Sequence, residues 1–243
     1  MIHPAPPGAG RVRRHAHAKL ALKCLIGAIF IGVLAAFFAF EGPRYLSLDA
    51  VKQNRDVLLE LTRAHYLASL VIGFVIYTTA TAFSVPSGIV LSLALGFLFG
   101  RWVATALIVV AGTIGATLLF LCARYLFAEP VRSRLGPMAK RINDGFTRDG
   151  FSWLLFLRLT PVVPYFLVNL APAVSGIRVR TYALATLIGI LPSTLVFTNL
   201  GQTLGAIEST RDLLAPETIV AFAALGLLAL APIVIRRWRS KRP

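Results

Sequence analysis

Three prolines interrupt the apolar stretch at residues 151–176, FSWLLFLRLTPVVPYFLVNLAPAVSG. Each of them, at positions 161, 164 and 172, removes a backbone donor and clashes with the carbonyl four residues earlier. The residue before each proline is also driven towards extended geometry. Inside a bilayer, such broken backbone persists only where protein or a water-filled cavity surrounds it. The stretch is therefore predicted to be a re-entrant hairpin with its tip at residues 160–164, rather than a simple membrane span.

The composition indicates an all-α polytopic membrane protein. Hydrophobic residues make up 57% of the chain and charged residues only 14%, whereas soluble domains carry about 25% charged residues. The formal net charge is +15, which raises the question of nucleic-acid binding. The basic residues lie at the ends of apolar segments, so membrane topology explains them better. We predict that the protein does not bind nucleic acid.

A second broken apolar stretch occupies residues 66–100 and is interrupted by SVPSG at residues 84–88. We predict a half-helix up to residue 83, a tip, and a return leg at residues 89–100. Gly96 and Gly100 lie four apart on the return leg, and such glycines let helix backbones approach closely. The residues predicted to break the helices at the two hairpin tips are Pro86, Gly88, Pro161 and Pro164.

Four full membrane spans are predicted around these hairpins, since each remaining apolar run approaches the roughly 20 residues that a span requires. They cover residues 24–40, 102–127, 181–204 and 217–235. The predicted organisation is a disordered basic cytoplasmic tail (1–23), the first transmembrane helix with an outer interfacial segment (24–65), a membrane core (66–205), and the last transmembrane helix with a basic cytoplasmic tail (206–243). In the interfacial segment, Ser47 is placed to cap a short amphipathic helix.

Charge sets the predicted orientation. Lys and Arg dominate the N-terminal tail, residues 128–150 and the C-terminal tail, while acidic residues gather in 41–64 and 205–217. The positive-inside rule places the basic group in the cytoplasm, together with both termini. This orientation holds only if the first hairpin enters and leaves on the outer side and the second on the inner side. The predicted fold is thus about four full spans plus two inverted re-entrant helical hairpins.

An internal repeat agrees with this inversion. Each hairpin is followed by a span that carries a helix-softening pair three residues apart, Gly112 and Gly115 in the first unit and Gly189 and Pro192 in the second. Inverted repeats with broken helices that meet near the bilayer midplane are typical of transporters.

The membrane core offers no catalytic or metal-binding pattern. No Asp or Glu occurs in residues 61–128 or 150–207, so a proton relay or a sodium site of the usual kind is disfavoured. HExxH, GxSxG and P-loop motifs do not occur in the sequence. His15 and His17 form a pair without an acidic or cysteine neighbour. We expect no enzyme activity, no cofactor and no metal.

Three polar residues are the candidates for a lipid-phosphate path: Arg158, Asn169 and Arg124. An arginine as deep as Arg158 is costly unless water, an anion or a partner reaches it. It either snorkels and bonds the open carbonyls of the hairpin tip, or draws a lipid phosphate into a cavity between the hairpins. Asn169 is expected to bond broken backbone and to line the path. Arg124 is expected to reach the headgroups from the inner end of its span.

Several motifs in order resemble one known family: PSGIVLSLALGFLFG, then GTIGATLLFLCARYL, then FLRLTPVVPYFLVNLAPAVSG. They resemble the VTT-domain or DedA-like family, also called the SNARE-associated Golgi protein domain, and most of all its Tvp-like bacterial branch. The resemblance implies two opposed re-entrant hairpins and a role in phospholipid movement. Two departures stand out: Ile89 occupies a place where the DedA branch carries an acid, and Pro164 a place where it carries a second arginine. A proton-driven mechanism therefore transfers poorly.

The function that these observations favour is scramblase-like or flippase-like movement of phospholipids or lipid-phosphate carriers, in a bacterial inner membrane. The expected partners are membrane phospholipids and anionic headgroups bound by an interfacial helix at residues 128–150, with a second copy of the chain as a further candidate. Two alternatives remain open, a small-solute or ion transporter and a non-transporting membrane scaffold.

Overall fold

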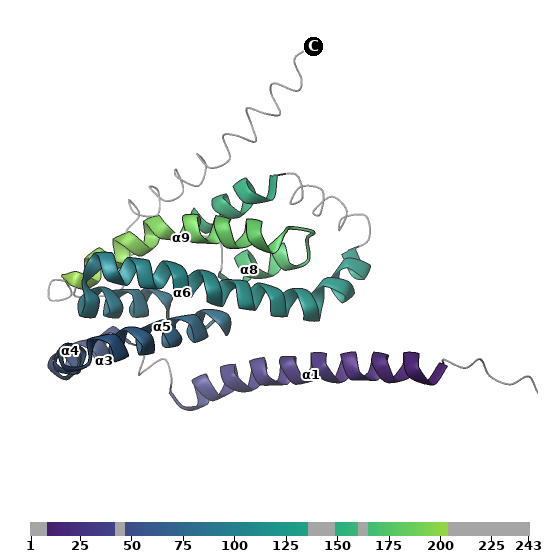
Figure 1. The fold of residues 1–243 in the computed structure, drawn as a ribbon, viewed down its shortest axis with the longest axis horizontal. Coiled ribbons are helices and arrows are strands. Elements are labelled where there is room, and N and C mark those ends of the chain that lie inside the picture. The colour runs from purple at the N-terminus through teal and green to yellow at the C-terminus, as the bar shows by residue number, and fades with distance from the viewer. Residues whose placement is uncertain (1–8, 42–46, 136–148, 160–164, 204–243) are drawn as a thin grey trace, which may run out of the picture.

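The computed structural model describes residues 9–41, 47–135, 149–159 and 165–203, which form helices joined by turns (Figure 1). The helices are α1 (Ala9–Ala39), α3 (Leu48–Gln53), α4 (Arg55–Ala64), α5 (Tyr66–Ala82), α6 (Gly88–Leu135), α8 (Tyr165–Ala173) and α9 (Val179–Gln202), with a further helical stretch at residues 149–159. Three of them are long and apolar enough to cross a membrane, or four if the bent pair α4–α5 counts as one span. This confirms an all-helical membrane protein. The predicted span at 217–235 and the predicted tip at 160–164 lie outside the described residues.

The first broken stretch turns where the sequence predicts. At the end of α5, the Val85 amide donates to the Ala80 carbonyl at 2.9 Å and the Ser84 amide donates to the Thr81 carbonyl at 3.1 Å. This pair of bonds is a Schellman motif, and its left-handed position is filled by Ser84 with φ 57°. Pro86 follows directly and cannot continue the helix. The chain then starts α6 at Gly88.

Gly100 divides α6 into two helical parts, because its φ of 74° and ψ of 164° lie in a region that only glycine adopts readily. The part before it, residues 88–99, folds back along α5, as the edge-to-face contact of Tyr66 and Phe99 at 5.7 Å shows. We predicted that Gly100 and Gly96 would both serve helix packing. Gly96 does, since an added Cβ would meet the backbone of Thr198, whereas Gly100 has nothing within 4 Å of an added Cβ and acts as the bend.

The second part of α6 and the whole of α9 run antiparallel and form the centre of the fold (Figure 1). The hydroxyl groups of Thr105 and Thr198 lie 2.7 Å apart in this contact. At one end, the Arg101 amide donates to Gln202 Oε1 at 3.1 Å. At the opposite end, Arg124 reaches the chain just before α9, as described below.

The contacts of the two predicted repeat units correspond. In the first unit, an added Cβ on Gly115 would lie 2.5 Å from the Thr78 carbonyl and 2.7 Å from Thr81 Cβ on α5. In the second unit, an added Cβ on Gly189 would lie 2.6 Å from Arg158 Cβ, on the leg at residues 149–159. In each unit, therefore, one glycine of the helix-softening pair lets the long helix touch the first leg of its own hairpin.

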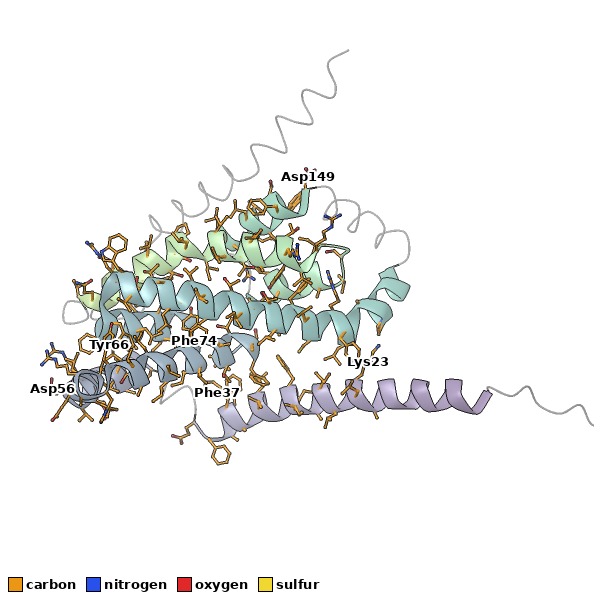
Figure 2. All side chains as sticks on the ribbon, in the orientation of Figure 1. Lys23, Phe37, Asp56, Tyr66, Phe74 and Asp149 are labelled. Carbon is orange, nitrogen blue, oxygen red and sulfur yellow. The ribbon has the colours of Figure 1, made fainter. Side chains whose placement is uncertain are left out.

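Segments that the positive-inside argument assigns to the cytoplasm lie at the same end of the bundle, and the orientation in a membrane stays a prediction. Ala9 of α1, the C-terminal end of α6 and the start of α9 lie at one end, while α3 and α4 lie at the other (Figure 1). Asp56 lies beside Tyr66 at the α4 end, and Lys23 and Asp149 lie towards the opposite end (Figure 2). Helix α4 is bent by 118° relative to α5. A helix that turns so sharply is suited to lie along the membrane surface.

Three local predictions need comment. The Ala50 amide donates to Ser47 Oγ at 3.1 Å, so the predicted capping role of Ser47 is confirmed.

Helix α1 begins at Ala9, inside the tail that we predicted to be disordered, because Ala, Arg, Lys and Leu favour helix once the early prolines have passed. Helix α6 continues through Pro130 to Leu135 instead of ending near residue 127, since one proline in a long helix removes a single backbone bond.

Replacing Gly100 by alanine tests the bend in α6. We expect Gly100→Ala to lower the free energy of unfolding by about 1–3 kcal/mol, because a Cβ is strained at this backbone conformation even without a clash. The measurement is the thermal unfolding midpoint of the purified protein in detergent. Gly32→Ala is the matched control: Gly32 also has nothing within 4 Å of an added Cβ, but it lies within the regular helix α1. Equal midpoints for the two variants would contradict the assignment.

Candidate functional site

Arg158 lies on the first leg of the second broken stretch, and the two hydrogens of its Nη2 are shared among three acceptors. It donates to Asn169 Oδ1 at 2.8 Å, to the Tyr182 hydroxyl at 2.8 Å and to Thr186 Oγ1 at 3.1 Å. We call these four residues the Arg158 cluster. Asn169 comes from α8, while Tyr182 and Thr186 come from α9. The bond from Arg158 to Asn169 shows that the leg at residues 149–159 and α8 lie side by side.

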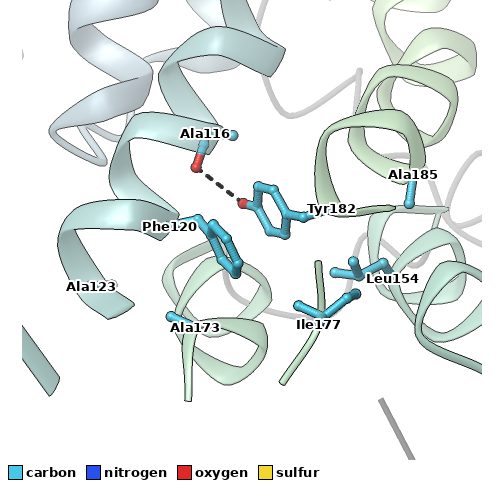
Figure 3. Close-up of a cluster of buried hydrophobic side chains, with 8 residues drawn as sticks. All are labelled: Ala116, Phe120, Ala123, Leu154, Ala173, Ile177, Tyr182 and Ala185. Carbon is cyan, nitrogen blue, oxygen red and sulfur yellow. Dashed lines mark hydrogen bonds between the residues drawn. The ribbon is translucent and has the colours of Figure 1, made fainter. Parts of the chain in front are cut away.

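Tyr182 is the hub of the Arg158 cluster. Its side chain is fully buried, and its hydroxyl lies 2.6 Å from Asn169 Oδ1 and 3.2 Å from the Ala116 carbonyl of α6 (Figure 3). A phenol has one proton to donate, so the nearer acceptor, Asn169, takes the stronger bond. The hydroxyl also accepts from Arg158. One residue therefore ties both broken legs to α6 and α9.

Two arginines flank a pair of stacked aromatic rings. Phe120 and Tyr182 stack with their centroids 4.1 Å apart and their planes at 13° (Figure 3). The guanidinium of Arg124 lies 4.3 Å from the Phe120 centroid, and that of Arg158 lies 5.5 Å from the Tyr182 centroid. The face of an aromatic ring attracts a cation. The stack thus stabilises both positive charges.

Arg124 clamps the backbone between α8 and α9. Its Nη2 donates to the carbonyls of Ser175 at 3.0 Å and Ile177 at 2.7 Å, and its Nε donates to that of Ala173 at 3.4 Å. The carbonyls at the end of a helix lack partners within that helix, and a cation is favoured there. We expected Arg124 to reach the headgroups, but these contacts direct it to the protein backbone. Its place in a lipid path stays a prediction.

The electrostatic character of the Arg158 cluster follows from its composition. The three acceptors named above are neutral oxygen atoms, and residues 61–128 and 150–207 supply no Asp or Glu. A guanidinium held by neutral groups keeps its attraction for an anion, because no carboxylate of these segments neutralises it. Within the described residues, no three His, Cys, Asp or Glu side chains gather in a way that suits a metal ion. A guanidinium in such surroundings is chemically suited to attract an anion.

The remaining predicted site residues are placed as follows. Pro86 and Gly88 are exposed at the tip of the first hairpin, while Pro161 and Pro164 lie outside the described residues. An added Cβ on Gly112 would touch Ile190 at 3.2 Å and Tyr77 at 3.3 Å, so this glycine joins α6 to α9 and α5. Pro192 lies half-buried within α9.

Sequence reasoning missed Tyr182, Phe120 and Thr186. Phe120 and Tyr182 lie in apolar runs, where an aromatic residue is ordinarily a core residue. The signal that existed was the position of Tyr182 and Thr186, four apart on one face of the predicted helix after the second hairpin. A buried arginine needs acceptors, and in a core without acids, the hydroxyl groups of nearby helices are the natural place to look for them.

The chain is similar in sequence to a known family of membrane proteins. The model of the VTT domain matches residues 85–203. The chain is 33% identical over 190 residues to "Transmembrane protein 41 homolog" of Dictyostelium discoideum, covering 77% of this chain and 57% of that protein. It is 25% identical over 248 residues to "Transmembrane protein 41B" of Xenopus laevis, covering 95% of this chain and 89% of that protein. The chain thus spans little more than half the length of the Dictyostelium relative. No solved structure matches the chain.

Removal of the Arg124 side chain tests the clamp. We expect Arg124→Ala to lower the free energy of unfolding by about 3 kcal/mol, because it leaves several carbonyls without their charged donor. Thermal unfolding in detergent measures the loss. Arg101→Ala is the control: its guanidinium is exposed and donates to Asn199 Oδ1 at 3.3 Å, so its loss should cost less than about 1 kcal/mol. The clamp is refuted if both variants unfold at the same temperature.

Proposed function

The chain belongs to the VTT domain family, and we propose that it moves phospholipids, or other lipids with a phosphate headgroup, across the bilayer without an energy source. The observation that carries this proposal is the Arg158 cluster, a guanidinium surrounded by neutral acceptors in a core whose segments 61–128 and 150–207 lack carboxylates.

The first hairpin fits a re-entrant placement. Phe83, at the tip, contacts Phe30 with ring centroids 5.7 Å apart. Phe30 is the middle residue of the candidate span Ala21–Ala39. Helix α5, with 17 residues, is about 25 Å long, which is shorter than the roughly 30 Å of a hydrocarbon core. A tip that meets the centre of a span supports a hairpin that turns at the midplane.

Arg158 also lies near the middle of the bilayer in this arrangement. It contacts Gly189 and bonds Thr186, which occupy the central part of α9. Bringing a positive charge to this depth is costly unless an anion or water accompanies it. A lipid phosphate that passes between the hairpins would meet this charge where the barrier to its own transfer is highest.

The proposed path assigns different roles to the residues. Arg158 attracts the phosphate, and Asn169 presents its amide beside the guanidinium. The proline tips, Pro86 and Pro161–Pro164, keep the two hairpins from closing into continuous spans. Arg124 is proposed at the inner end of the path while its clamp holds the second hairpin. Since the core segments offer no carboxylate for proton transfer, movement follows the lipid gradient in either direction.

The proposed setting is a bacterial inner membrane with both termini in the cytoplasm. The support is the distribution of basic residues, since the start of α1 and the end of α6 share one end of the bundle (Figure 1). Residues 128–150 are proposed to contact anionic headgroups on that side. Association with a second copy of the chain is a further part of the proposal that experiments on the purified protein can address.

Cysteine labelling tests the re-entrant topology. After Cys24 and Cys122 are replaced by alanine, single cysteines at His65 and Arg101 are both expected to react with a membrane-impermeant maleimide from the outside of intact cells. The reason is that a hairpin returns to the side from which it entered. Arg178→Cys, before α9, should react only after the membrane is opened. Opposite accessibility of positions 65 and 101 would show that the first stretch crosses the bilayer and would end the proposal.

Lipid exchange in liposomes tests the role of the Arg158 cluster. Dithionite bleaches fluorescent lipids in the outer leaflet, so exchange appears as bleaching beyond that of empty vesicles. We expect exchange by the wild-type protein and exchange that is about tenfold slower with Arg158→Ala, because a charge-assisted hydrogen bond is lost. Asn169→Asp is the sharper variant. It places a carboxylate at the bonding distance of 2.8 Å from Arg158, so it should slow exchange while it preserves or raises the unfolding midpoint.

Arg101→Ala serves as the control for these variants, because it removes an arginine outside the cluster. A purely structural role for Arg158 predicts the opposite behaviour of Asn169→Asp, with improved folding and undiminished exchange. No exchange above empty vesicles by the wild-type protein would remove the proposed function altogether.

The corresponding contacts of the two repeat units favour a second candidate, a small-anion transporter with hairpins that open alternately. Saturable uptake of a soluble anion, dependent on Arg158 and without lipid exchange, would identify this function instead.

A further inference from the structure

The tip of the first hairpin contains buried polar atoms that the proposed path does not use. The Ser87 side chain is 3% exposed, and its Oγ has no hydrogen-bond partner among the residues that the structure describes. Thr78 Oγ1, on the last turns of α5, likewise has no hydrogen-bond partner among the described residues. A buried hydroxyl without a partner costs free energy, and lipid provides no partner either. A polar ligand at this tip would relieve that cost.

Ser87 also stands at the amide end of a helix. Its carbonyl accepts from the Leu91 amide at 2.9 Å, which opens the first turn of α6. The amides of the three residues in between have no acceptor within the helix, by the geometry of a helix start. In many helices the hydroxyl of such a serine would bond one of these amides. Here Ser87 Oγ and the helix end instead form a set of donors.

The surroundings of this tip favour an anion over a cation. Tyr77 places its hydroxyl 3.3 Å from Ser92 Oγ, and that hydroxyl lies 4.0 Å from where a Cβ on Gly88 would be. Ser92 Oγ donates to the Gly88 carbonyl at 2.7 Å, which occupies an acceptor that a cation would need. Residues 61–128 contain no Asp or Glu that would repel a phosphate. The positive end of the helix dipole adds to the attraction.

The inverted repeat gives this tip a counterpart. Ser92 in the first unit corresponds to Asn169 in the second, and Thr81 corresponds to Arg158, because the same offset along the chain separates the two residues of each pair. Ser92 and Asn169 are both buried. In the second hairpin the buried polar residue bonds an arginine and a tyrosine, Tyr182. In the first, Ser92 bonds a tyrosine, Tyr77, and the arginine position is held by a threonine. The first hairpin therefore offers hydroxyl and amide donors where the second offers a charge.

We propose that the tip of the first hairpin is a second binding site for phosphoryl oxygens, formed by Ser87 Oγ and the amide end of residues 88–90, with the Tyr77 hydroxyl beside it. The inference deepens the proposed function and rests on it for the choice of a phospholipid as the ligand. A neutral site suits brief binding, since it holds a phosphate by hydrogen bonds without a fixed counter-charge.

Binding in micelles tests this site without transbilayer movement, so its failure and that of lipid exchange are separate results. The full-length protein in a neutral maltoside is titrated with short-chain phosphatidylglycerol, and the unfolding midpoint reports binding. We expect Ser87→Ala to bind the lipid about tenfold more weakly, because one hydrogen bond to a charged acceptor is lost. The same weakening is expected in an Arg158→Gln background, which shows that the two sites are distinct.

Two matched variants sharpen the result. Ser193→Ala makes the same change on α9, where Ser193 Oγ already donates to the Ile190 carbonyl at 3.0 Å, and should leave lipid binding unchanged. Ser87→Thr retains the hydroxyl and should retain binding. Without lipid, Ser87→Ala should unfold at the same temperature as the wild type or higher, because no bond within the described protein is lost. A drop in midpoint that is equal with and without lipid would identify a plain helix cap and overturn the proposal.

The source of the phosphoryl group is read from two further titrations. A shift with phosphatidylglycerol but none with inorganic phosphate identifies a lipid headgroup, and equal shifts identify a phosphate ion; both outcomes keep the site. A shift of the same size with a short-chain diacylglycerol, which lacks phosphate, would show that the headgroup is not recognised. Unchanged lipid affinity in Ser87→Ala would refute the site directly.

Discussion

Backbone groups at the broken ends of helices must find partners inside this protein, because hydrocarbon offers none. The structure meets this demand reciprocally. Arg124 of α6 serves the carbonyls that precede α9. At the opposite end, Gln202 of α9 accepts from the amide of Arg101, which follows the bend at Gly100. Helix α6 thus stabilises the break before α9, and α9 stabilises the break at Gly100 within α6. The two repeat units therefore depend on one another for their fold.

Close contacts between helices also depend on groups inside the protein, because lipid does little to drive helices together. Where a long helix meets a hairpin leg or its partner helix, glycine removes the side chain that would hold backbones apart, as at Gly96 against Thr198 and Gly115 against Thr78. The hydrophobic effect does little to join helices within lipid, so packing and polar contacts decide the association. The pair of threonine hydroxyls between α6 and α9 adds such a polar contact at the centre of the fold.

The sequence was sufficient to predict the first tip and the glycines at which the long helices approach their neighbours, because prolines and glycines act through local chemistry. It also singled out Arg158, whose role in a lipid path stays a prediction. It was not sufficient to separate a packing glycine from a hinge, since Gly96 and Gly100 have the same spacing and differ only in backbone conformation. It also could not reveal that Tyr182 serves Arg158, because that contact joins segments whose register is set by α6 and α9 together. The start of α1 was missed because charge and nearby prolines suggested a tail, while helix propensity decided the outcome.

The two hairpins differ in the polar groups that they carry. A guanidinium keeps its charge where an ammonium would tend to lose its proton on burial, so arginine is the cation suited to membrane depth. Neutral oxygens of Asn169, Tyr182 and Thr186 position it, and in the proposed path an approaching phosphate competes with these acceptors. The first hairpin instead carries the buried hydroxyl of Ser87 beside the start of α6. Under the proposed function, a phosphate that leaves the charged hairpin for the neutral one would exchange a strong attraction for several weaker bonds. We propose that the weaker site favours release of the headgroup, so that it does not remain bound at the centre of the bilayer.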